Sequence, residues 1–267
     1  MNAAIVAQID KRLADIRKQH RVAIPLAIES GSRAWGFVSP DSDYDCRFIF
    51  VRPADAYLSP WPQRDVIETP LDKVFDVNGW DLAKALKLLL KGNAVVIEWL
   101  TSPIAYAVDG AFRSQFLALA RQVCDRHRIA RHYLHLGLRQ RRTYFGDDTS
   151  VAQKKIFYAL RPAAALRWLR LHPDARIAPM HFPTLMSQCE APKRVTSLVD
   201  DLMARKAVTR ELESKPLPRA LAAFIDGEFE RWDRGLAGSI AQESDRARAL
   251  AEAFFLSWVR RLDTSRR

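Results

Sequence analysis

The hydrophobic and polar positions at the start of the chain alternate between helical and strand-like spacing. Apolar residues recur at spacings of three and four between residues 3 and 19, which predicts an amphipathic helix. Over residues 21–28 the apolar side chains share one parity, and residues 44–51 are rich in β-branched and aromatic side chains. Both patterns are typical of β-strands. We therefore expect a helix followed by two strands.

The next segment adds shorter elements. Strands are predicted over residues 65–69 and 72–77, followed by a tight turn and a helix that begins at Asp81 and ends before Gly92. Residues 94–100 are apolar over too short a length for periodicity to separate a short helix from a buried strand. Both interpretations stay open for this run.

From about Gly110 onward the strand patterns fade and helical stripes dominate. The one long loop expected in this half covers residues 172–194. We predict an α+β protein, with a small mixed β-sheet domain and its flanking helices over residues 1–108 and an α-helical domain over 109–267. The helices expected in the second half are 111–124, 129–144, 149–171, 196–204, 218–233 and 244–262.

Charge and cysteine content narrow the class of protein. The 267 residues include 42 lysines and arginines and 31 acidic residues, which gives a formal net charge of +11. This charge favours nucleotides or nucleic acid as partners. Three widely spaced cysteines give no disulfide framework and suggest a reducing compartment. No window approaches the ~20 apolar residues that span a bilayer. We expect a cytoplasmic, soluble protein without a membrane partner.

The candidate chemistry lies at a pair of aspartates that enters the second strand. Side chains two residues apart point to the same face of a strand, so Asp43 and Asp45 are expected side by side. A divalent cation is the usual means of holding two adjacent carboxylates, and Mg²⁺ takes one or two of them together with water and substrate phosphates. The turn at Gly31 and Ser32 just upstream could offer N–H groups and a hydroxyl to those phosphates. These residues predict a site for a metal and a phosphorylated substrate.

The spacing of Gly31-Ser32 and Asp43-x-Asp45 resembles the signature of the nucleotidyltransferase superfamily related to DNA polymerase β. Several further segments look like the YcgL-type predicted nucleotidyltransferases, a group that includes the RNA repair pathway polymerase β family. Together these segments extend to about Trp168, and such a run of separate matches is much more specific than the Gly-Ser turn alone. They are Gly31–Gly36, Ser42–Asp45, Asn78–Asp81, Lys91–Asn93, Glu98–Leu100 and Lys155–Trp168.

The resemblance implies a Mg²⁺- or Mn²⁺-dependent enzyme that uses an NTP such as ATP. In the superfamily a third carboxylate on a neighbouring strand joins the Asp-x-Asp pair, and two-metal catalysis generally requires it. Asp76 is our choice because it lies in a strand-like segment at the expected distance downstream. Asp81 is the alternative, although a helix N-cap explains it more simply. The expected catalytic and metal-binding set is therefore Asp43, Asp45 and Asp76.

Nucleotide-binding residues are expected on both halves of the chain. Gly31 and Ser32 would hold the triphosphate, and Arg33 would bind it through its guanidinium unless it only packs at the surface. In superfamily members with a helical second domain that domain closes the nucleotide cleft. One helix face here carries Tyr158 and Arg161, with Lys155 adjacent, and these three are expected to contact phosphate or base.

Two further groups have more than one interpretation. Cys124 and His127 have the spacing of a zinc pair, but the surrounding arginines make a basic helix face the better account. Together with neighbouring tyrosines that face would suit an RNA or DNA backbone, whereas ordinary surface arginines remain the simpler explanation. Glu98 would be costly to bury alone, so it is either exposed or paired.

The leading hypothesis is transfer of an NMP from an NTP to an acceptor hydroxyl, with release of pyrophosphate. The acceptor is not identified by the sequence, although a nucleic acid, as in RNA repair, fits the charge. One alternative is a catalytically silent module that binds nucleic acid. Another is a toxin–antitoxin-type enzyme that nucleotidylates a protein. Nucleotide preference and oligomeric state are not encoded in any pattern found here.

Overall fold

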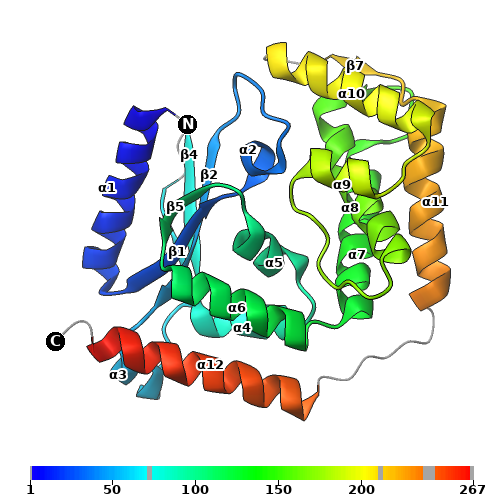
Figure 1. Cartoon of the computed structure of the whole chain (residues 1–267). Helices are drawn as coiled ribbons and strands as arrows, with labels where there is room; N and C mark the ends of the chain where they lie inside the picture. Colours follow the sequence, from blue (N-terminus) through cyan, green and yellow to red (C-terminus); the bar gives the residue numbers. More distant parts are fainter. Residues whose placement is uncertain (1, 71–73, 210–212, 237–243, 265–267) are drawn as a thin grey trace.

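The core of the fold is a five-stranded mixed sheet with helices on both faces (Figure 1). The computed structural model describes residues 2–70, 74–209, 213–236 and 244–264. The strand order is β3-β4-β2-β1-β5, in which β2 and β4 are parallel and the other pairs are antiparallel. The strands are β1 (Ala23–Glu29), β2 (Tyr44–Val51), β3 (Val66–Glu68), β4 (Phe75–Asp81) and β5 (Ala105–Val108).

One face of the sheet is covered by α1 (Ala3–His20), which follows the predicted amphipathic stripe. Ile9, Leu13 and Ile16 are buried and pack with Phe48 and Phe50 of β2 in a separate small core. Alternate side chains of β2 point to opposite faces, so this strand contributes to two hydrophobic cores. The sheet is thus buried on both sides near its centre.

The opposite face carries the larger core, built from three helices of the first half of the chain and from the last helix. These are α4 (Leu82–Leu90), α5 (Ala94–Thr101), α6 (Gly110–Val123) and α12 (Asp245–Thr264). Two short helices, α2 (Gly31–Trp35) and α3 (Ala54–Leu58), connect the strands. The run 94–100, which the sequence left open, is therefore helical, and Asn93 caps it by accepting from Val95 N–H at 2.9 Å.

The helical part is built around α7 and α8, which lie side by side and pack on α11. The loop expected over 172–194 contains a helix of two turns, α9, and the helix expected from Thr149 begins at Gln153 after a short strand. Pro162 lies inside α8. The elements of this part are α7 (Arg126–Tyr144), β6 (Val151–Ala152), α8 (Gln153–Leu171), α9 (Phe182–Gln188), α10 (Lys193–Val208), β7 (Ser214–Lys215) and α11 (Arg219–Leu236).

The α+β class with a small mixed sheet is confirmed. The chain crosses between its two parts twice. It leaves the sheet part after α6, which packs on α5 and β1, and it returns after α11, since α12 packs on α4 and α6. The division at residue 108 stays a prediction. Among the described residues, no helix combines the length and apolarity needed to cross a membrane.

Candidate active site

A pocket of about 400 Å³ lies between the start of β2 and the helices α7 and α8. That volume is within the range of small-ligand sites. Its walls combine the Gly-Ser turn and the aspartate pair on one side with aromatic and basic side chains on the other. The lining residues are Ser30, Gly31, Ser32, Trp35, Asp43, Asp45, Arg47, Leu136, Gln140, Tyr144, Tyr158 and Arg161. The pocket therefore brings together most of the residues that the sequence selected.

Gly31 is required by the close approach of the turn to Asp45. Its φ is +62°, a left-handed conformation that side chains disfavour, and a Cβ there would lie 2.0 Å from Asp45 Oδ2. Ser30 N–H donates to the main-chain oxygen of Asp45 at 2.8 Å, which fixes the turn against β2. Ser32 Oγ donates to Ser42 Oγ at 2.9 Å and so ties α2 to the segment that carries Asp43.

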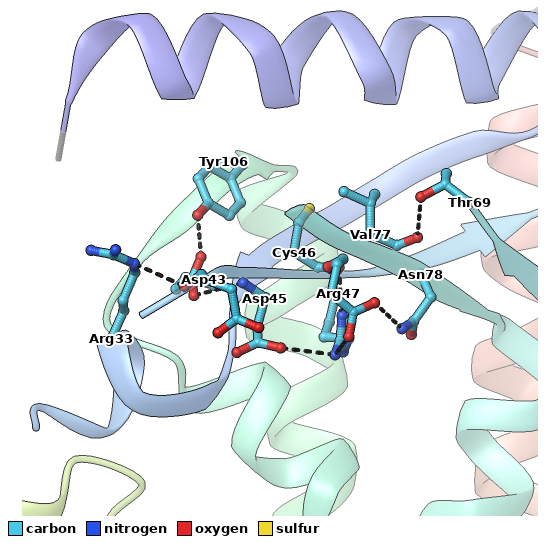
Figure 2. Close-up of polar contacts among 11 residues, drawn as sticks. Arg33, Asp43, Asp45, Cys46, Arg47, Thr69, Val77, Asn78 and Tyr106 are labelled. Carbon is cyan, nitrogen blue, oxygen red and sulfur yellow. Dashed lines mark hydrogen bonds and ion pairs between the residues drawn. The ribbon is translucent and has the colours of Figure 1, made fainter. Parts of the chain in front are cut away.

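Arg33 holds this same segment. Its Nε donates to Asp43 O at 3.0 Å (Figure 2). Its Nη2 donates to Ser42 O at 2.5 Å, and the guanidinium lies 3.8 Å from the centre of the Tyr44 ring. Arg33 is not among the residues that line the pocket. Its contacts explain the shape of the loop, and phosphate binding by Arg33 stays a prediction.

The aspartates lie near one another as predicted, and Arg47 lies between Asp45 and Asp76. Asp45 and Asp76 are direct register partners on the parallel strands β2 and β4, as expected for Asp76. Arg47 Nη2 lies 3.0 Å from Asp45 Oδ1 and 2.6 Å from Asp76 Oδ2, and Asn78 Nδ2 donates to Asp76 Oδ1 at 3.2 Å. Figure 2 shows Asp43 and Asp45 close together with Arg47 reaching Asp45.

The three aspartates differ in how well they fit a divalent cation. Burial raises the pKa of Asp45 against the opposing effect of Arg47, and the nearby charge of the exposed Asp43 raises it further. Those two hard oxygen donors fit a Mg²⁺ that completes its shell with water and phosphate. Arg47 contacts one oxygen of Asp45 and one of Asp76. Asn78 contacts the other oxygen of Asp76, so metal binding by Asp76 requires these partners to move and stays a prediction. Within the described residues, no three His, Cys, Asp or Glu side chains are placed to share one metal ion.

Asp81, the alternative third carboxylate, is a buried helix cap. Its Oδ1 accepts from Ala83 N–H at 2.8 Å and its Oδ2 from Tyr57 Oη at 3.0 Å. Arg52 Nε lies 3.8 Å from Oδ2. These contacts use both carboxylate oxygens, which agrees with the N-cap interpretation.

Glu29 is a carboxylate that sequence reasoning missed. It is fully buried at the end of β1, where its Oε1 accepts from Asp45 N–H at 3.0 Å and its Oε2 accepts from the hydroxyl of Tyr106. Burial raises the pKa of Glu29 to about 7, against the opposing effect of the Tyr106 hydrogen bond. A glutamate at the end of an apolar strand carried no signal of this role, because strand ends are commonly exposed.

The wall opposite the aspartates is anchored by a buried ion pair. Arg161 Nη1 and Nη2 lie 2.7 and 3.2 Å from the two oxygens of Glu98, and Tyr133 Oη donates to Glu98 at 3.3 Å. The guanidinium of Arg161 also lies 4.1 Å from the Trp35 ring. Glu98 is therefore buried and paired, and it fixes Arg161 at the pocket wall.

Aromatic side chains complete the wall. The rings of Tyr144 and Tyr158 lie 6.1 Å apart, and Lys155 Nζ lies 4.6 and 4.8 Å from their centres. Two other lining residues carry buried polar atoms without a hydrogen-bond partner, Trp35 Nε1 and Gln140 Oε1. Leaving such atoms unpaired costs about 1–3 kcal/mol each, which marks this wall as incomplete without a ligand. Neither residue was selected from the sequence.

Charged residues near the pocket and the Cys124 segment have structural partners in the described chain. Lys154 pairs with Asp41 at 2.7 Å, on the outside of the loop before β2. Arg141, part of the basic face of α7, is bound by Asp148 at 2.5 Å and Asp226 at 2.9 Å, so its charge is neutralised. No zinc site forms at Cys124 within the described residues, and burial raises the pKa of this thiol to about 12.

Comparison with known proteins gives two matches. The sequence model of the RNA repair pathway DNA polymerase beta family matches residues 5–257. "Uncharacterized protein YcgL" of Bacillus subtilis (strain 168) is 36% identical over 225 residues, which cover 84% of this chain and 85% of that protein.

Proposed function

The chain belongs to the RNA repair pathway DNA polymerase beta family, and from this membership we propose that it is a nucleotidyltransferase. The reaction would transfer an NMP from an NTP to an acceptor hydroxyl with release of pyrophosphate. The observation that carries the proposal is a single pocket lined by residues from both halves of the chain. Asp43, Asp45 and the Gly31 turn line one side, and Tyr158 and Arg161 line the other. Phosphoryl and nucleotidyl transfer need positioning and charge neutralisation more than covalent catalysis, and this pocket offers both.

Each wall of the pocket would contact a different part of the NTP. Gly31 and Ser32 would receive the triphosphate at the turn, and Arg161, whose charge Glu98 balances, would offer N–H donors to a phosphate oxygen. Tyr144 and Tyr158 would supply stacking surfaces for the base, since base–aromatic stacking is worth about 1–3 kcal/mol per base. The substrate would therefore lie between the sheet and α8.

Asp43 and Asp45 would hold Mg²⁺ or Mn²⁺, which neutralises charge on the phosphates and lowers the barrier to departure of pyrophosphate. In the transfer, the acceptor oxygen bonds to the α-phosphorus and the bond from that phosphorus to the pyrophosphate oxygen breaks. We assign the proton released by the acceptor to Asp76. That role requires Arg47, which contacts Asp76 at 2.6 Å, to exchange this partner when substrates bind.

The experiment supplies α-³²P-labelled NTPs, one at a time, with Mg²⁺ or Mn²⁺ and separate RNA, protein and metabolite fractions. We expect label to enter one fraction with the wild type, and transfer to fall by about 10²-fold or more with Asp43→Asn or Asp45→Asn, the scale of losing one electrostatic contact at a reacting centre. Asp55→Asn on α3, exposed and outside the pocket, is the matched control. Full transfer by both pocket variants would refute the assignment of these carboxylates.

The ion pairs of Arg47 favour a second candidate, a catalytically silent protein that binds nucleic acid. In this case Arg47 would neutralise Asp45 and Asp76 permanently, in place of a metal. A silent module would label no fraction with any NTP in the transfer assay. In a separate binding measurement it would bind RNA or DNA with steep salt dependence.

A further inference from the structure

A cleft larger than the pocket lies away from it, at the N-terminal end of α7. It measures about 770 Å³ and is formed by the end of α6, the start of α7, the segment after α8 and the start of α12. Its charged lining consists of five arginines and two aspartates, which leaves an excess of three positive charges. The arginines are Arg121, Arg126, Arg128, Arg176 and Arg246.

Two of these arginines are held in place by neutral partners. Arg126 donates to the main-chain oxygen of Leu169, and Arg176 Nη1 donates to the main-chain oxygens of Gln122 and Cys124 at 3.2 Å. Carbonyl oxygens orient a guanidinium without cancelling its charge. The Nε of Arg126 is also buried without a partner. The cleft therefore holds oriented cations before any ligand arrives.

Two more arginines are available at the rim. Arg121 and Arg246 are exposed, and in the part of the chain that the structure describes neither of them forms an ion pair with a carboxylate. Guanidinium groups bind phosphate oxygens through paired N–H donors. Two oriented arginines, one half-buried and one exposed, together with the two exposed arginines at the rim suit a ligand that carries several phosphates.

The cleft and the reaction pocket are separated along α7, by about 12 Å between their nearest lining residues on that helix, Arg128 and Leu136. Arg126 lines the cleft and Gln140 lines the pocket, and both lie on α7. At 1.5 Å of rise per residue, the two positions are about 21 Å apart along the helix. At ~3.4 Å per nucleotide of a stacked strand, this distance corresponds to roughly six nucleotides. A phosphodiester chain is the ligand class with this reach and charge.

We propose that this cleft binds the phosphate backbone of a single-stranded RNA about six nucleotides from the end that enters the reaction pocket. The inference rests on the proposed function for the reacting end only, since backbone binding requires no transfer. The acceptor is then a strand rather than a nucleoside or a protein hydroxyl. Short acceptors fill the pocket alone, and longer ones fill both sites.

The test is binding of a fluorescein-labelled 12-nucleotide RNA, measured by anisotropy in EDTA from 0.05 to 0.5 M salt without NTP. The variant is Arg121→Ala/Arg246→Ala, and the control is Lys18→Ala/Arg219→Ala, which removes two exposed charges outside the cleft. Each lost phosphate contact reduces the slope of log K against log salt by about 0.7 for a single strand. We expect the slope of the variant to fall by about 1.4, with roughly 20-fold weaker binding at 0.1 M salt, and little change in the control.

An equal loss of RNA affinity in variant and control would overturn the inference, because the cleft would then bind nothing specific. Loss of wild-type RNA binding in millimolar ATP would also overturn it, because the cleft would then bind only a nucleotide. A length series completes the test. Transfer to a 12-nucleotide acceptor should show a higher KM in the variant, whereas a trinucleotide acceptor should be unaffected. Absence of transfer to every acceptor with intact RNA binding would contradict the proposed function and leave the cleft assignment standing.

Discussion

Replacing Glu29 by glutamine should remove a pH dependence of stability that arises at the end of β1, beside Asp45. Glu29 is fully buried, and burial raises the pKa of its carboxyl from 4.5 to about 7. Glutamine keeps the shape and both hydrogen-bonding positions, accepting from Asp45 N–H and facing the Tyr106 hydroxyl. It cannot ionise, so the variant isolates the cost of the buried charge.

The magnitude follows from proton linkage. Because the pKa of Glu29 is higher in the folded state than in the unfolded chain, the folded state binds more protons between pH 4.5 and about 7. Its contribution to the free energy of unfolding is fully present below pH 4.5 and is lost as the pH rises through about 7. At ~1.4 kcal/mol per pKa unit, the loss between pH 5 and pH 8 is roughly 2.5 kcal/mol.

The assay is urea unfolding of wild type and Glu29→Gln at several pH values from 5 to 8, in EDTA so that metal binding at Asp45 does not contribute. The free energy of unfolding of the wild type should fall by roughly 2.5 kcal/mol more than that of the variant over this range. Glu252→Gln, an exposed position on α12, should follow the wild type. Parallel curves for wild type and Glu29→Gln would show that Glu29 ionises normally, and the reasoning from burial would fail.

Three other substitutions test separate parts of the structure. Gly31→Ala should reduce nucleotide transfer in a labelled-NTP assay while far-UV circular dichroism stays unchanged, because the new Cβ would lie 2.0 Å from a carboxylate oxygen of the pocket. Glu98→Ala should lower the free energy of unfolding in urea by about 3–5 kcal/mol, since it leaves the buried charge of Arg161 without its partner. Gly137→Ala should cost about 1–3 kcal/mol in the same measurement, because its Cβ would lie 2.3 Å from the ring of Phe229; an unchanged midpoint would mean that α7 and α11 separate easily.

The sequence was a good guide wherever a local pattern decides the structure. The apolar stripe of residues 3–19 became α1, and the parity of Asp43 and Asp45 placed both in one pocket. The position of Asp76 beside Asp45 depends on the pairing of β2 with β4; the resemblance implied only a neighbouring strand for the third carboxylate, and the register shows which strand that is. Periodicity alone could not have given that pairing.

Contacts between distant segments were not predictable. Glu98 and Arg161 are 63 residues apart, and only the tertiary fold, in which α7 packs on both α5 and α8, makes a buried pair of them. Arg47, two residues after Asp45, looked like an ordinary strand residue, although it joins Asp45 to Asp76. Side chains that act through tertiary neighbours carry no spacing signal, because their partners are set by the fold.

The double crossing of the chain between its two parts has a mechanical consequence. A single linker lets two bodies swivel, whereas two links confine them to rotation about the line that joins the links. One link runs from α6 into α7 at Cys124 and Asp125, and the other enters α12 at Ser244. All three residues line the arginine cleft. The cleft thus lies where the chain passes between its two parts, so a ligand held there would contact residues at both crossings and couple the two parts mechanically.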